Sequence, residues 1–336
     1  SIEWYNYAGD QLVRTSPTDA ESSYTKTNAR TDFYSVSGHL EWSHLFADVH
    51  DVKVMVGSQY NMKEYEYTYI RAMGILPSLE IPSSKDGLIY LTSDDKKTNS
   101  SKWQEAVLSY FGRANYNYRS KYMLEGQFRY DGSSKFQPEN RWAFYWGVSG
   151  GWRLSEEPFI KKSIGKVLTN AKFRYSWGKV GSDAGAKRWN YIQQFTSDGN
   201  ITLGTDASGQ IWGPLYHEGD VANLNSTWEK STKQNLGIEI GLWNKLDITL
   251  DLFDEKRKDI LMEPQTTSFI TGAKFNALNI GSTKNHGFEL ELHYNDKIGS
   301  DFRYHVGFTL ASSENRVVFR DDPVNGPDHL KEAGKP

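Results

Sequence analysis

The sequence predicts an all-β fold, an antiparallel transmembrane β-barrel of which this chain carries about ten strands. Three observations lead to this prediction. Apolar and polar residues alternate with a period of two along most of the 336 residues. Short and long connections follow one another between the alternating stretches. Tyr and Trp gather near the ends of the apolar faces, as Trp142 and Trp152 do.

The alternation is clearest around residues 108–130. Tyr110, Tyr116 and Leu124 fall on one parity, and Arg113 and Glu125 fall on the other. A period of two is the strand signature, because successive side chains of a strand point to opposite faces. The same pattern predicts strands around 34–42, 52–56, 108–118, 122–130, 144–154, 172–177, 236–242, 246–252, 288–294 and 302–310. A short helix is expected near 156–168.

The connections divide into two classes of length. Those around 46–51, 119–121, 243–245 and 295–301 are short, and 155–168 falls on their side by parity. Those around 72–102, 131–141, 180–230 and 255–283 are longer. Outer-membrane barrels have short periplasmic turns and long extracellular loops. We therefore expect Ser120 and Asn244 to be periplasmic, and Ser133 and Ser208 to be extracellular.

A soluble β-sandwich or soluble barrel is the alternative, because antiparallel sheets in general alternate in this way. Such a fold would suit a secreted or surface β-sheet module that binds glycans. Repeated charges on the polar face and aromatic residues near strand ends favour lipid on the apolar face. Examples of those aromatic pairs are Tyr116 with Tyr118 and Tyr294 with Tyr304.

Composition excludes several classes of protein. The chain has no Cys, so it has no disulfides and no thiolate metal sites. No apolar run approaches the roughly 20 residues of a spanning helix. The net charge of −3 gives no electrostatic basis for binding nucleic acid.

The sequence contains no catalytic constellation. The 8 His lack metal-ligand spacing, and no nucleophile elbow, P-loop or HExxH motif is present. Asp183, Asp198 and Asp206 lie near glycines, where calcium could bind, but turn formation explains them better. We therefore expect no enzyme activity, no metal and no cofactor.

Five segments, in order, resemble the SusC/RagA family of TonB-linked (TonB-dependent) outer-membrane transporters of Bacteroidetes. They are YFGR (110–113) through RYDGSSKF (129–136), NRW (140–142) with GWRLSEEPF (151–159), FRYSWGKVG (173–181), WEKSTKQNLGIE (228–239) and NIGSTKNHGFE (279–289). This order covers most of residues 105–312. The resemblance implies a large barrel closed by a plug domain.

The resemblance also implies a function. It implies import of a nutrient too large for porins, with an oligosaccharide favoured and an oligopeptide as the alternative. The implied partners are a SusD-like surface lipoprotein, TonB-ExbB-ExbD acting through the plug, and outer-membrane lipid. We expect residues 1–336 to be a fragment of the barrel domain, without plug domain, TonB box or closing C-terminal strands.

Two sets of residues are candidates for the site. Asp131, Gly132, Ser133 and Ser134 are turn-forming types, so we expect them to shape the extracellular rim. Trp228 and Glu229 stand at the start of a predicted strand, and we expect them to anchor that end of the strand. Aromatic rings stack on sugars and on peptide side chains. The ring-bearing residues of the 180–230 loop are therefore the substrate-binding candidates, and they are Trp189, Tyr191, Trp212, Tyr216 and His217.

Overall fold

A computed structural model of the chain describes residues 4–8, 11–15, 23–73, 99–206, 209–266, 272–323 and 325–336. Ser208 and most of the predicted loop at 72–102 lie outside these residues. The chain divides into two compact units. Unit 1 comprises residues 1–35 and 61–105, and unit 2 comprises residues 36–60 and 106–336.

Unit 1 contains the antiparallel hairpin of β1 (Trp4–Ala8) and β2 (Gln11–Thr15). It also contains parts of β3 (Ser23–Phe46), β4 (His50–Met73) and β5 (Asn99–Tyr118). Within it, Lys102 Nζ lies 2.8 Å from Glu64 Oε1, and the rings of Tyr65 and Trp103 stack at 5.1 Å.

Unit 2 holds the remainder of these strands and all later elements. The later strands of the main sheet are β6 (Tyr122–Ser133), β7 (Trp142–Arg153), β8 (Leu168–Ser182), β11 (Glu229–Leu242), β12 (Leu246–Met262), β13 (Leu278–Ile298) and β14 (Phe302–Phe319). The short helices are η1 (Pro138–Asn140), η2 (Leu154–Glu156) and α1 (Pro158–Ser163). None of the helices in the described residues has the length and apolar character that a membrane crossing requires.

The main sheet has ten strands in the order β14-β13-β12-β11-β8-β7-β6-β5-β4-β3. Each strand of the main sheet pairs with the strands that precede and follow it in the sequence. The one exception in this order is the pair of β8 and β11, between which a hairpin is inserted. The described residues form an open sheet that ends at β3 and β14. This confirms the predicted all-β antiparallel fold and its partial barrel.

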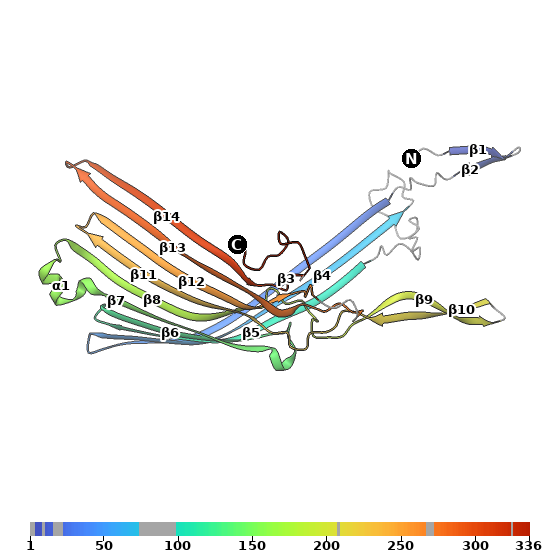
Figure 1. Ribbon diagram of the computed structural model, residues 1–336, viewed down its shortest axis with the longest axis horizontal. Coiled ribbons are helices and arrows are strands. Elements are labelled where there is room, and N and C mark those ends of the chain that lie inside the picture. The colour runs from blue at the N-terminus through green and yellow to red at the C-terminus, as the bar shows by residue number, and fades with distance from the viewer. Residues whose placement is uncertain are drawn as a thin grey trace. The chain divides into compact units, whose positions relative to one another are not determined.

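The inserted hairpin corrects the sequence prediction, which treated residues 180–230 as a loop. It consists of β9 (Phe195–Asp206) and β10 (Gly209–Glu218), which pair with each other alone among the described residues. We call it the arm. In Figure 1 it extends from the end of unit 2 opposite to α1.

Short turns collect at the α1 end of unit 2, which we call the turn end, and the opposite end is the loop end (Figure 1). Positive φ angles at Arg119 and Ser120 (51° and 55°) and at Trp243 and Asn244 (54° and 55°) close two of these turns. These angles match a type I′ turn, whose twist suits a two-residue hairpin.

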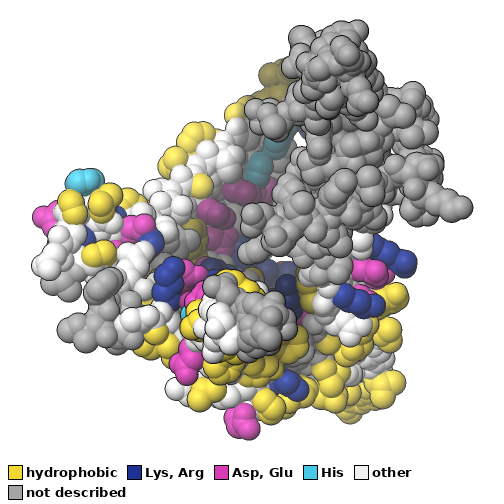
Figure 2. All heavy atoms as spheres, turned by 90° about the vertical axis from the view of Figure 1, so that its right-hand side faces the viewer, with side chains coloured by type: hydrophobic (Ala, Val, Ile, Leu, Met, Phe, Trp, Pro, Cys, Tyr) yellow, Lys and Arg dark blue, Asp and Glu magenta, His cyan; other side chains and the backbone are white. Residues whose placement is uncertain are grey.

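The two faces of the sheet follow the predicted alternation. Tyr110 pairs with Tyr130 and Tyr118 pairs with Tyr122 on the apolar face. Tyr122 and Tyr130 are eight residues apart, about 26 Å along a strand, which is close to the apolar band of outer-membrane barrels, about 25 Å tall. Among the described residues no second layer covers this face, and Leu124 is 60% exposed. Figure 2 shows many such exposed hydrophobic side chains.

The polar face of unit 2 carries a ladder of charges across three strands. Arg174 of β8 lies 3.3 Å from Glu239 Oε1 of β11 and 2.6 Å from Asp251 Oδ2 of β12. Lys172 Nζ also lies 3.3 Å from Glu239 Oε1. Figure 2 shows acidic and basic side chains gathered toward the centre of the view. A hydrated inner wall would carry charges in this way.

Candidate functional site

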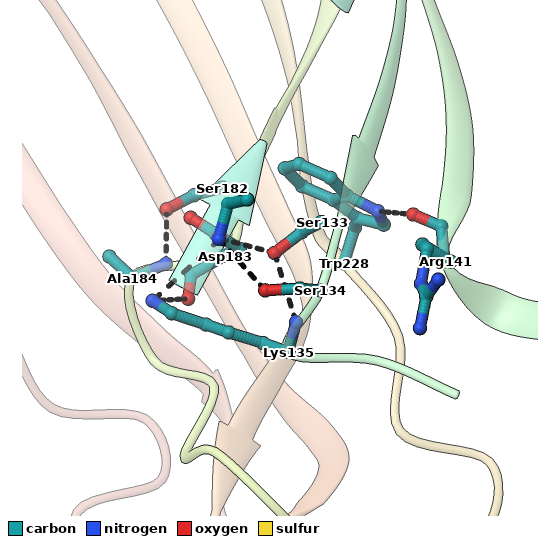
Figure 3. Close-up of polar contacts among 9 residues, drawn as sticks. Ser133, Ser134, Lys135, Arg141, Ser182, Asp183, Ala184 and Trp228 are labelled. Carbon is teal, nitrogen blue, oxygen red and sulfur yellow. Dashed lines mark hydrogen bonds and ion pairs between the residues drawn. The ribbon is translucent and has the colours of Figure 1, made fainter. Parts of the chain in front are cut away.

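The loop end of unit 2 contains a small buried core, built largely from the motif residues that the sequence singled out. Phe136 is fully buried and Trp228 is nearly so. Their rings lie 5.5 Å apart, and Tyr145 meets Trp228 edge-on at 5.9 Å. The indole N–H of Trp228 donates to the carbonyl of Arg141 at 2.8 Å, as Figure 3 shows. This core joins the ends of β6, β7 and β11.

Ser133 and Ser134 fasten the end of β6 to its neighbours (Figure 3). The hydroxyl of Ser133, which is fully buried, donates to Asp183 Oδ2 at 2.7 Å. Lys135 Nζ reaches the same carboxylate at 3.7 Å and the Asp183 carbonyl at 3.1 Å. The hydroxyl of Ser134 accepts the backbone N–H of Ala106 at 2.9 Å. Asp183 is therefore held by protein groups, which fits the turn role better than a calcium site.

Asp131 and Gly132 precede these serines at the same strand end. Asp131 is buried and accepts from the guanidinium of Arg129 at 3.1 Å. A Cβ on Gly132 would lie 2.7 Å from the indole of Trp142. The position thus requires glycine for the close approach of that ring.

Glu229 follows Trp228 and is also buried. Its Oε1 accepts the backbone N–H of Leu261 at 3.3 Å, which ties β11 to the end of β12. The motif residues therefore lie together as the fixed part of the loop end.

Three amide side chains that the sequence pattern does not single out connect three loops; those of Asn190 and Asn223 are buried and that of Asn279 is half-buried. Asn190 Nδ2 donates to Ser226 Oγ at 3.2 Å and to the carbonyl of Ala277 at 2.9 Å. Asn223 Nδ2 donates to the same carbonyl at 2.8 Å. Asn279 Nδ2 donates to the carbonyl of Thr227 at 2.8 Å. Asn is common in turns, so residue type alone did not mark these positions.

A polar hollow of about 620 Å³ lies between these loops and the base of the arm. We call it the rim hollow. Its lining includes both signs of charge, amides and one indole, with Lys187, Trp189, Asn190, His217, Glu218 and Lys274 among the residues. Drug-sized ligand sites span about 300–1,000 Å³. The rim hollow therefore has the size of a site for part of a small polymer.

Ion pairs shape the edge of the rim hollow. Lys187 Nζ bonds to Glu263, and this bond, with the charge of Lys187, lowers the pKa of the Glu263 carboxyl below its ordinary value. His217 Nδ1 lies 2.7 Å from Asp198 Oδ2 at the base of the arm. Within the described ranges, no three His, Asp or Glu side chains come together as metal ligands.

The structure brings two of the five substrate-binding candidates together. Trp189 and His217 line the rim hollow, although 28 positions separate them in the sequence. Trp189 is half exposed and has a φ of 67°, in the left-handed region. Trp212 and Tyr216 are exposed on β10 of the arm, and Tyr191 is half-buried; none of these three lines the rim hollow.

Comparison with known proteins identifies the family. The model for the TonB dependent receptor-like β-barrel family matches residues 1–330. The TonB-dependent receptor SusC of Bacteroides thetaiotaomicron is 28% identical over 222 residues, which are 64% of this chain and 21% of that protein. TonB-dependent receptor P3 of Formosa agariphila is 29% identical over 213 residues, which are 63% of this chain and 20% of P3.

Solved structures agree in fold. The RagAB peptide importer in its open-open state matches 96% of this chain with a TM-score of 0.76 and 20% identity, and the match covers 34% of that chain. The chain thus spans about a fifth of these curated relatives and about a third of that structure. These relatives are receptors and transporters rather than enzymes. The chain belongs to the TonB-dependent receptor-like β-barrel family, is of the SusC/RagA type, and forms part of a bacterial outer-membrane β-barrel.

Proposed function

We propose that this chain supplies barrel wall and extracellular mouth to a TonB-dependent importer of a nutrient too large for porins. Residues 1–336 belong wholly to the barrel domain in this proposal. Cargo binds at the loop end and leaves through the polar side of the wall when TonB-ExbB-ExbD acts through the plug. A SusD-like surface lipoprotein holds cargo from above. The observation that carries the proposal is the rim hollow, a polar recess beside an indole at the loop end.

An oligosaccharide is the favoured cargo. The indole of Trp189 offers a flat face for a sugar ring, and the neighbouring amides and charged groups suit its hydroxyls. Trp212 and Tyr216 are exposed on the arm, where they can contact further residues of a long cargo or the lipoprotein. Tyr191 is half-buried in the loop before the arm and stays a candidate for contact with cargo.

An oligopeptide is the second candidate. Lys187 and Lys274 lie on the same recess as Glu218 and Asp220. Both termini of a peptide, and side chains of either charge, would find a partner there.

Two tryptophan variants of the full-length protein test the proposal. Trp189→Ala removes the ring from the rim hollow, whereas Trp212→Ala removes an equally exposed ring from the arm. We expect Trp189→Ala to weaken cargo binding roughly five- to tenfold, since an aromatic contact contributes about 1–1.5 kcal/mol. Trp212→Ala should have the smaller effect. Binding of glycan and peptide mixtures is measured by calorimetry. An unchanged Kd for Trp189→Ala would remove the rim hollow from the proposal.

A second experiment, deletion of the arm, tests whether the arm contributes to uptake and to binding of the lipoprotein. The backbone N–H of Gly219 donates to the carbonyl of Gln194 at 2.7 Å, so the two ends of the arm are adjacent. Thr196 and His217 pair with each other, so a short Gly-Ser linker can replace residues 197–216 and keep the His217 and Glu218 of the rim hollow. We expect normal barrel assembly, slower uptake and weaker co-purification of the lipoprotein. Uptake and co-purification at parental levels would show that the arm has neither role.

A further inference from the structure

The segment between β7 and β8 exposes apolar and basic side chains at the turn end. Phe159 is 60% exposed, Ile164 47% and Val167 43%. Lys162 and Lys166 are exposed and have no ion-pair partner within the part of the chain that the structure describes. Short helices between strands usually bury their apolar residues. Here Phe159 of α1, with Ile164 and Val167 just after it, stays uncovered by any other described residues.

Glu157 fixes the side of the sheet on which this segment begins. Its buried carboxylate accepts from the Tyr122 hydroxyl at 2.6 Å and from Trp152 Nε1 at 3.2 Å, and it lies 3.5 Å from Lys121 Nζ. Tyr122 and Trp152 pair directly across β6 and β7 on the apolar face. The segment therefore starts at the lipid-facing aromatic band and continues that surface beyond the strand ends.

A second turn adds an aromatic ring to the same region. The backbone N–H of Trp243 donates to the carbonyl of Val167 at 2.8 Å, so the β11–β12 turn lies beside the end of the segment. Trp243 is 54% exposed. Tryptophan prefers the boundary between lipid headgroups and acyl chains, because one part of its ring is apolar and the other can donate a hydrogen bond.

We propose that these residues form an in-plane membrane anchor on the periplasmic surface of the outer membrane. The turn-end anchor comprises Phe159, Lys162, Ile164, Lys166, Val167 and Trp243. Phe159 and Ile164 insert below the headgroups, and Lys162 and Lys166 bind the phosphates of anionic phospholipids. Apolar residues next to free cations are the composition that binds such a surface. The surface is continuous with the lipid-facing band, which favours lipid over a protein as its occupant.

The turn-end anchor rests on the outer-membrane position of the barrel and not on import, so its test does not depend on cargo. Two single-cysteine variants, Phe159→Cys and Ile164→Cys, are made in a cysteine-free version of the full-length protein. Each is labelled at its cysteine with the fluorophore NBD. Ser300→Cys, exposed in the β13–β14 turn at the same end, is the matched control. The proteins are placed in vesicles of phosphatidylethanolamine and phosphatidylglycerol. We expect quenching by brominated acyl chains at 159 and 164, and quenching by aqueous iodide at 300.

The contribution of charge is measured on the same probes. Replacing Lys162 and Lys166 together by Gln should abolish the dependence of the Phe159→Cys signal on the phosphatidylglycerol fraction. Lys297→Gln, at the end of β13, is the control and should preserve it. An unchanged dependence in the double variant would overturn the phosphate contacts.

Two results would overturn the anchor itself. One is iodide access at 159 and 164 equal to that at 300. The other is protection of 159 and 164 that appears only when periplasmic proteins are added, which would show that a protein covers this surface. Heat-dependent gel mobility confirms that each labelled barrel is folded.

Discussion

At the scale of the residue, the motifs that characterise the sequence serve to build the loop end. Ser133 and Trp228 are buried and bonded to neighbouring strands, and Gly132 makes room for an indole. Their residue types predict a turn at the rim and an anchor for a strand, because short polar side chains and glycine have few other uses at a strand end. The partners of these residues, Asp183 and Arg141, lie 50 and 87 positions away and could not be read from local pattern.

Trp228→Phe tests the anchor. Phenylalanine retains the contacts with Phe136 and Tyr145 but removes the indole donor, so that the carbonyl of Arg141 keeps only the backbone N–H of Ser133, at 3.2 Å. One such hydrogen bond contributes about 0.5–1.5 kcal/mol, so we expect the barrel to unfold at a lower temperature in detergent. Trp212→Phe, on the exposed arm, is the control and should change stability by less than about 0.5 kcal/mol. Equal midpoints for Trp228→Phe and the parent would show that the bond does not stabilise the loop end.

At the scale of the element, the turns were predicted well and the loops less well. Short links at 119–121 and 243–245 appear as two-residue turns because the alternation stops and restarts around them. Several strands extend far beyond the alternating stretches, as β13 does from Leu278 to Ile298. Beyond a bilayer both faces of a strand meet water, so the alternation is lost while the pairing continues. The arm escaped prediction for a related reason, since Gly199, Gly204 and Pro214 interrupt its pattern.

Ser120→Gly tests the turn geometry. Ser120 has a φ of 55°, which an L residue adopts at a cost of about 1–2 kcal/mol and glycine adopts freely. Part of this gain is offset by the greater freedom of glycine in the unfolded chain. We expect a net stabilisation of about 0.5–1 kcal/mol in urea titrations. Ser149→Gly, inside β7, is the control and should destabilise. A loss of stability for Ser120→Gly would contradict the left-handed turn.

Ionisation of Glu157 makes the stability of the turn end depend on pH. Hydrogen bonds from Tyr122 and then Trp152, with the charge of Lys121, hold the pKa of Glu157 below its ordinary value of 4.5. Because the folded pKa is the lower one, the stabilisation is present above the ordinary value and is lost as the pH falls through the folded pKa. Glu157→Gln should therefore be less heat-stable than the parent at neutral pH, and the difference should disappear in acid. Glu139→Gln, exposed in η1, is the control. A difference that persists unchanged in acid would remove ionisation as its cause.

At the scale of the whole molecule, the alternation of apolar and polar residues was the main basis for predicting the fold. A meander of antiparallel strands needs no long-range signal, because each strand pairs with the next along the chain. The sequence therefore predicted the order of the sheet, whereas the rim hollow depends on Trp189 and His217 meeting across an unrecognised hairpin. The two faces of the sheet offer the clearest test of the fold. A position that faces lipid requires an apolar residue, whereas the next position, which faces water, accepts a charged one.

Adjacent residues of β12 provide that test. Leu250 pairs with Ile238 and Leu290 on the apolar face, and Thr249 pairs with Glu239 and Glu291 on the polar face. Leu250 is four residues from the level of Tyr294, about 13 Å, which places it near the middle of the apolar band. Leu250→Arg should cost about 2–4 kcal/mol, because a cation near the bilayer midplane loses its hydration. Thr249→Arg gains two acidic neighbours and should assemble normally. Assembly is followed by heat-dependent gel mobility in outer-membrane preparations. If both variants assembled equally, or if Thr249→Arg were the defective one, the assignment of the apolar face to lipid would be wrong.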